Sequence, residues 1–162
     1  MDLTAFLERL GELPLSTHIA ETWWFPLLES IHVLASTFLV GSVLMVDLRL
    51  MGVASQSQAV TRITREVLPW TRLAALVAVV TGALLFLANT VRYWENPAFR
   101  IKLALLVLAG VNMAYFHLRT VRDVIEWDGG AAPPAPARFA GAFSVLLWIG
   151  IMLSGRWVGH LI

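Results

Sequence analysis

The sequence predicts an all-α integral membrane protein: a four-helix bundle with an N-terminal amphipathic surface helix. Of 162 residues, 58% are hydrophobic and only 14% are charged, against about 45–50% and about 25% in soluble domains. A soluble domain of this length has too little interior to bury so much apolar surface. Four stretches also reach the roughly 20 apolar residues that span a bilayer. Lipid is therefore the expected solvent of most of the chain.

The N-terminal segment, residues 1–25, is predicted to hold an amphipathic helix that lies on the membrane surface. Apolar residues recur there at positions i, i+3, i+4 and i+7, namely Leu3, Phe6, Leu7 and Leu10. Charged residues occupy the other positions, which is typical of an interfacial helix. The segment lacks the basic and apolar regions of a cleavable signal peptide, so we expect the first span to serve as an uncleaved insertion signal.

A single transmembrane domain is predicted over residues 26–158, followed by a short tail, residues 159–162. Its spans cover residues 26–50, 68–90, 99–118 and 139–158. Pro26 is expected in the first turn of the first span, and Asn96-Pro97 separates the second span from the third. The Gly- and Pro-rich run from Asp128 to Pro136 predicts an irregular linker.

Each span also carries two small residues four positions apart, a pattern that lets helix backbones approach closely in lipid. The pairs are Thr37/Gly41, Ala78/Gly82, Gly110/Ala114 and Gly150/Ser154. This pattern predicts a compact bundle and carries no functional information.

The distribution of basic residues predicts the orientation. Side A is the side with both termini and the loop between the second and third spans, and side B holds the other two loops. Near side B lie Arg49, Arg62, Arg65, Arg72, Arg119, Arg122 and Arg138, and near side A lie Arg9, Arg92, Arg100, Lys102 and Arg156. The positive-inside rule then places side B in the cytoplasm of a bacterial cell and both termini in the periplasm.

Several function classes are excluded or disfavoured. The net charge of +1 does not fit a nucleic-acid-binding protein, which carries a clustered basic face. The absence of cysteine excludes thiolate metal sites and iron–sulfur clusters. No nucleotide-binding, hydrolase, zinc-protease or EF-hand motif occurs. We therefore expect a membrane protein without hydrolase or transferase activity, whose partners are the lipid bilayer and a membrane protein or a second copy of the chain.

The first span carries the clearest candidate site residues. At 100° per residue, Glu29, His32, Ser36 and Asp47 fall within about 60° of one another. His32 lies about 10 Å below the side-A boundary by helical rise. An imidazole at that depth can ligate haem iron, bind a metal, relay protons or make a structural hydrogen bond. Glu-x-x-His is half of a di-iron motif, but the other spans offer no carboxylate at this depth.

One functional hypothesis is a b-type haem protein of membrane electron transfer, with His32 as an axial ligand and His160 or His18 as a second. Basic residues near side A would contact the propionates: Arg92, Lys102 and Arg156. His117 cannot share an iron with His32, because the two lie about 17 Å apart in depth. A structural or proton-relaying His32 is the other interpretation.

A second polar cluster is expected at side B, where Asp47, Arg49, His117 and Arg119 lie at similar depth. Such a cluster either balances buried charge or admits protons. Asn112, in the middle of the third span, is either an interhelical hydrogen-bonding group or part of a site. In the interior near side A, Lys102 either pairs with Glu29 or extends towards the interface.

Two further functions stay open: a non-enzymatic subunit of a larger membrane complex, and a small carrier or proton-relay protein that uses the polar face of the first span. The absence of an internal repeat or a broken helix gives a transporter little support.

The combination of several motifs resembles a known group of proteins. The motifs are Glu29-Ser30-Ile31-His32-Val33-Leu34, Val46-Asp47-Leu48-Arg49-Leu50, Leu68-Pro69-Trp70, Thr81-Gly82, the run Asn96 to Leu103, and Asn112 with His117. Together they resemble a family of small bacterial four-helix membrane proteins of unknown function, from about Trp24 to Arg156. More distantly, the layout is similar to four-helix b-type cytochromes and copper-resistance-D-like membrane proteins. The resemblance implies the fold but no activity, and the same-depth histidine pair of four-helix b-type cytochromes is missing.

Overall fold

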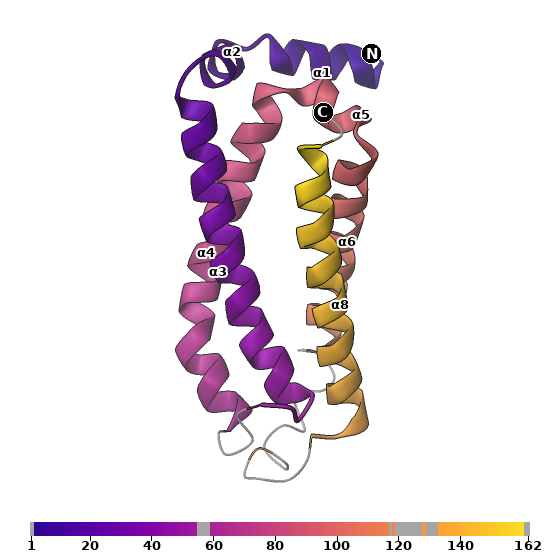
Figure 1. The fold of residues 1–162 in the computed structure, drawn as a ribbon. Helices are drawn as coiled ribbons and strands as arrows, with labels where there is room; N and C mark the ends of the chain where they lie inside the picture. Colours follow the sequence, from indigo (N-terminus) through magenta and orange to yellow (C-terminus); the bar gives the residue numbers. More distant parts are fainter. Residues whose placement is uncertain (1, 55–58, 117, 119–127, 129–132, 161–162) are drawn as a thin grey trace.

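The computed structural model describes residues 2–54, 59–116, 118, 128 and 133–160, and the regular structure in these residues is helical (Figure 1). The helices are α1 (Leu3–Gly11), α2 (Pro14–Glu21), α3 (Trp24–Leu50), α4 (Val60–Ala88), α5 (Thr90–Glu95), α6 (Pro97–Tyr115) and α8 (Ala135–Val158). Among them α3, α4, α6 and α8 are long and apolar enough to cross a membrane. The predicted all-α membrane bundle is confirmed.

The first long helix matches its predicted span closely, whereas α4 begins at Val60 rather than at residue 68. The extra residues include Thr61 and Arg62, which are helical without being apolar. Asp128, from the segment before α8, caps this end. Its Oδ1 atom accepts hydrogen bonds from the backbone N–H of Val60 at 2.5 Å and of Thr61 at 3.4 Å. Hydropathy therefore identified the apolar part of α4 and not the full helix.

The turn between α4 and α6 contains the short helix α5, which starts after the interruption at Asn89, where φ is −150° and ψ is 54°. Asn96 then caps α6: its side-chain oxygen accepts from the N–H of Ala98 at 2.9 Å and of Phe99 at 3.3 Å. Its amide also donates to the carbonyl of Val158, at the end of α8, at 3.2 Å. The predicted break at Asn96-Pro97 is confirmed, and the same residue ties α6 to α8 at side A.

The last long helix begins at Ala135, so the prediction of irregular structure is wrong for Ala135 and Pro136. Pro136 lies in the first turn, where a proline has no intrahelical N–H bond to lose. Similarly, α6 begins at Pro97 rather than at residue 99, because a first-turn proline again opens the helix.

The bundle consists of two helix pairs, α3 with α4 and α6 with α8, which are joined by contacts between α3 and α8. At side B, Gly141 of α8 lies against α3. A Cβ atom there would stand 2.9 Å from the carbonyl oxygen of Asp47 and 3.2 Å from the Cβ of Leu50. A buried cluster of Leu50, Val60 and Ala137 lies at this end. Glycine thus permits a backbone contact that holds the two pairs together.

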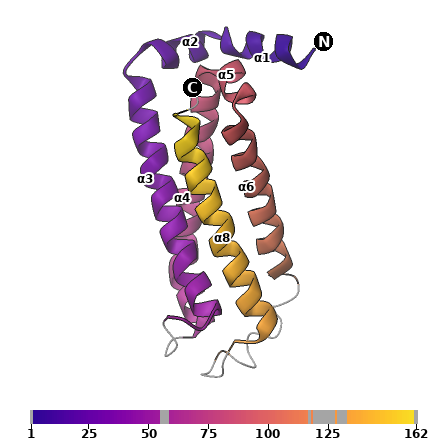
Figure 2. The same ribbon diagram turned by 45° about the vertical axis from the view of Figure 1, so that its right-hand side comes forward.

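The N-terminal helices α1 and α2 lie across the side-A end of the bundle (Figures 1 and 2). The predicted N-terminal helix is α1, and a second short helix, α2, follows it and opens with Pro14. The Thr90 hydroxyl of α5 donates to the carbonyl of Leu7 at 2.7 Å, and Ile19 packs with Leu28 of α3. The first contact ties this layer to α5, and the second ties it to the membrane-spanning helix α3.

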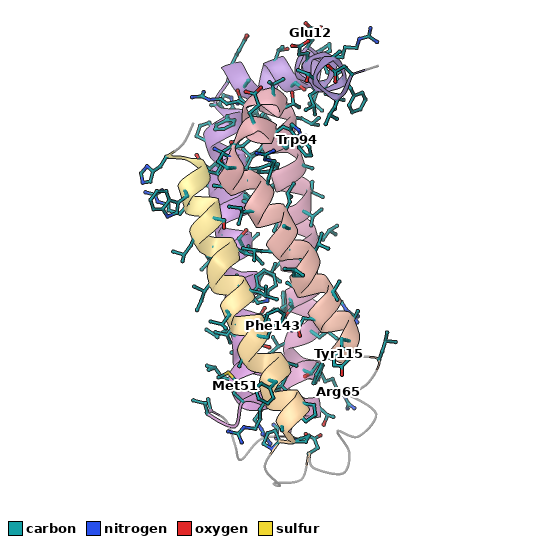
Figure 3. The ribbon with its side chains drawn as sticks, turned by 90° about the vertical axis from the view of Figure 1, so that its right-hand side faces the viewer. Glu12, Met51, Arg65, Trp94, Tyr115 and Phe143 are labelled. Carbon is teal, nitrogen blue, oxygen red and sulfur yellow. The ribbon has the colours of Figure 1, made fainter. Side chains whose placement is uncertain are left out.

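The two ends of the molecule differ in what covers them. Figure 3 shows Trp94 beside the N-terminal helices at one end, and Met51, Arg65 and Tyr115 at the other. Both described chain ends lie at the first of these (Figure 1), as the assignment of both termini to side A requires.

Candidate functional site

The imidazole of His32 lies in the interface between α3 and α4. Its Nδ1 atom is 2.9 Å from the carbonyl oxygen of Ala78 and 3.1 Å from the hydroxyl of Thr81. Because a carbonyl oxygen can only accept, Nδ1 carries the proton and donates it. The Thr81 hydroxyl donates to the carbonyl of Val77 at 2.7 Å, so it too receives a hydrogen bond from His32. In the neutral ring this leaves the lone pair on Nε2.

Gly82 provides the space that the ring occupies. A Cβ atom at Gly82 would lie 3.0 Å from Cε1 of His32 and 3.4 Å from its Nδ1. The ring therefore packs directly on the backbone of α4, and its orientation is fixed by the two hydrogen bonds and this contact. Among the residues that the structure describes, none makes a hydrogen bond with Nε2.

Lys102 reaches the same region from α6. Its Nζ atom lies 3.4 Å from the position of a Cβ atom at Gly155 of α8, and its charge is close enough to act on His32. The described part of the chain contains an ion pair between Arg62 and Glu66 but none between Lys102 and Glu29. Two of the predicted haem contacts, His32 and Lys102, thus come from opposite helix pairs to one interior region.

Three aromatic rings form a layer nearer side A. The rings of Phe86 and Phe99 stack with centroids 5.4 Å apart, and Tyr93 lies 5.6 Å from Phe99. Phe86 follows Gly82 by one helical turn and Phe99 precedes Lys102 by about one turn. The layer therefore stands between the His32–Lys102 region and the side-A end of the bundle.

Tyr93 connects this aromatic layer to the charges of side A. Burial raises the pKa of its phenol, the nearby Glu29 carboxylate raises it further, and Arg92 opposes both effects. The Glu29 side chain itself is exposed. Glu29 therefore acts on Tyr93 rather than as the partner of Lys102.

The other predicted haem contacts lie on the surface. His18 of α2 is exposed, and so are Arg92 and Arg156. His160 is exposed too, and its ring meets the edge of Trp157 at 6.4 Å. No described contact joins His18 or His160 to His32.

At side B, Asp47 and Arg49 are 5% and 2% exposed. The other members of the predicted cluster, His117 and Arg119, lie outside the described residues. Asn112 donates a hydrogen bond to the carbonyl of Ala140 in α8 at 3.1 Å, so it is an interhelical hydrogen-bonding group. The two charged side chains of α3 are therefore buried near side B, and the predicted histidine partner lies outside the described residues.

The sequence did not indicate the partners of these side chains. Ala78, Thr81 and Gly82 surround His32, and Ser144 of α8 interacts with the Asp47 carboxyl group. Thr81-Gly82 stood among the family motifs, and this pair was the available signal. Among the described residues no three histidine, aspartate or glutamate side chains gather as a metal site.

Comparison with known proteins gives one match. No curated protein and no solved structure is detectably similar to the chain. The model of a family of unknown function, DUF6644, matches residues 16–161 and so includes α3, α4, α5, α6 and α8. The chain therefore belongs to this family of unknown function, DUF6644.

Proposed function

We propose that the protein binds a b-type haem between its two helix pairs and serves in membrane electron transfer, with His32 Nε2 as the axial ligand. One observation carries the proposal: the imidazole of His32 and the amino group of Lys102 lie in one interior region, each without a described partner for its lone pair or its charge. His32 offers a lone pair with no described hydrogen bond, and Lys102 offers a cation with no described ion pair.

The setting of His32 supports iron ligation. A histidine ligand usually donates its second ring N–H to a carbonyl or carboxylate, which fixes the ring and makes the ligating nitrogen more basic. The bond from Nδ1 to Ala78 has this form. A purely structural histidine would gain the same stabilisation from the hydrogen bond to Ala78. It would not need an Nε2 atom without a hydrogen-bond partner.

Lys102 supports the same group from the opposite side. A lysine within a membrane span is costly unless a counter-charge or water accompanies it. A haem propionate would supply that charge, and Phe86 and Phe99 would supply an apolar wall. When bound, the haem would carry one electron at a potential set by its ligand and its burial. The proposal assigns one protein ligand, His32, because His18 and His160 are exposed.

A visible spectrum of the full-length protein, purified in mild detergent from haem-replete cells, tests the proposal. We expect a Soret band and a dithionite-dependent change. The band should disappear in His32→Ala and persist in His18→Ala and His160→Ala, which are matched controls. Lys102→Gln should keep the band and weaken haem retention. A colourless wild-type preparation contradicts the proposal.

We also propose that the protein lies in the inner membrane of a bacterium, with side B in the cytoplasm. The distribution of basic residues supports this orientation, because they are more numerous near side B, the side that the positive-inside rule then places in the cytoplasm.

A further inference from the structure

Asp47 is a buried carboxyl group that the proposed haem site does not use. It lies one turn before the side-B end of α3 and is 5% exposed. Gly141 brings the backbone of α8 against the Asp47 carbonyl, and the Ser144 side chain lies close enough to interact with the carboxyl group. The second carboxyl oxygen, Oδ2, is fully buried and has no hydrogen-bond partner among the described residues.

No described cation neutralises this carboxyl group. Arg49 is two residues further along α3, about 200° around the helix, and so projects from the opposite face. It makes interactions of its own, and no described ion pair joins it to Asp47. On the helices that pack against α3, the charged residues near side B are exposed: Arg62, Arg65, Glu66 and Arg72 of α4, and Arg138 of α8.

The neutral and the ionised form of the Asp47 carboxyl group differ greatly in the free-energy cost of burial. An unpaired carboxylate with an open oxygen in a protein interior loses its hydration with nothing in exchange, whereas a neutral acid loses far less. We propose that Asp47 is a proton-binding site, at which Oδ2 takes up a proton from side-B water and forms an O–H bond, and releases it again, in the folded protein. The inference rests on Asp47 alone and is independent of haem.

Dicyclohexylcarbodiimide tests it, because this apolar reagent adds the O–H of a protonated buried carboxylic acid across its N=C bond. The full-length protein in detergent is treated at several pH values and analysed by intact mass and peptide mapping. We expect one main adduct, on the peptide that contains Asp47, with a yield that falls as the pH rises. Asp47→Asn should abolish it, and Glu66→Gln, at an exposed acid of the same bundle, should leave it unchanged.

Two further variants make the test more specific. Ser144→Ala removes an interaction that favours the ionised form, so labelling should persist to higher pH. His32→Ala should keep wild-type labelling, which separates this inference from the haem proposal. Lack of an Asp47 adduct in folded wild-type protein at acidic pH overturns the inference. Protection by sodium chloride but not by choline chloride overturns it too, since Oδ2 would then hold a metal cation.

Discussion

Gly82 leaves the space that the ring of His32 occupies between α3 and α4. Other glycines of the long helices differ in whether a side chain fills the space beside them. A Cβ atom at Gly150 of α8 would lie 3.0 Å from the side chain of Leu105. A Cβ atom at Gly41 or Gly110 would have no such neighbour within 4 Å. The small-residue pairs of the four spans look alike in the sequence. Only the packed structure separates a glycine that admits a side chain from one that faces lipid.

We expect Gly82→Leu to displace the His32 ring and break its bond to Ala78, because a side chain at residue 82 meets Cε1 at 3.0 Å. Forcing extra atoms into a packed interface costs roughly 1–3 kcal/mol. The matched control is Gly110→Leu, on an open helix face, which should be neutral or slightly stabilising because leucine is the better helix former. Reversible unfolding by SDS titration in mixed micelles measures both changes. Equal effects of the two substitutions would contradict the assigned contact.

For single residues, the sequence predicted the depth in the membrane and the kind of interaction that the side chain can make. It did not predict which residues the side chain contacts. Helical rise placed His32 inside the membrane, and the side-chain chemistry of Asn112 left two alternatives open, an interhelical hydrogen bond or part of a site. Whether Lys102 pairs with Glu29 or extends towards the interface depended on the rotation of α6 relative to α3. Contacts between helices, such as that of Lys102 with Gly155, set this rotation. The sequence of one helix alone does not determine such contacts.

At the scale of elements, apolar length predicted the number and order of the spans, while hydrogen bonds at the ends set their limits. The polar first turns of α4 are stabilised by Asp128, a residue far along the chain. Such a long-range cap leaves no local pattern, which is why the sequence placed the start of α4 at residue 68. Asn96 is a local cap followed by proline, and the break at Asn96-Pro97 was predicted correctly.

Removal of the Asp128 side chain should loosen the start of α4. Its carboxylate accepts from the backbone N–H groups of Val60 and Thr61 and from the Thr61 hydroxyl, and loss of a capping side chain costs about 1 kcal/mol. We expect Asp128→Ala to lower stability by about that amount and to speed amide exchange in the first turn of α4. Asp2→Ala is the control, since Asp2 precedes α1 without a side-chain cap bond. Unchanged exchange in Asp128→Ala would show that the cap does not form in the membrane.

At the scale of the whole molecule, the apolar composition predicted the medium and the fold class, but not the pairing of helices. The pairs α3/α4 and α6/α8 follow the chain order, and α8 joins α3 rather than α4. This arrangement places the side-B ends of the four long helices at one end of the molecule and both described chain ends at the other (Figure 1). A bundle with this layout can insert in two orientations, and its basic residues then decide between them.

The proposed orientation makes a labelling prediction that the absence of native cysteine makes easy to test. Val53→Cys places a thiol at a side-B position that is 66% exposed, and His160→Cys places one at an exposed side-A position. Neither substitution changes an arginine or a lysine, so the charge bias that directs insertion is preserved. A membrane-impermeant maleimide should label residue 160 in intact spheroplasts and residue 53 only after lysis. The reverse pattern would place both termini in the cytoplasm, and Asp47 would then exchange its proton with the periplasmic side instead.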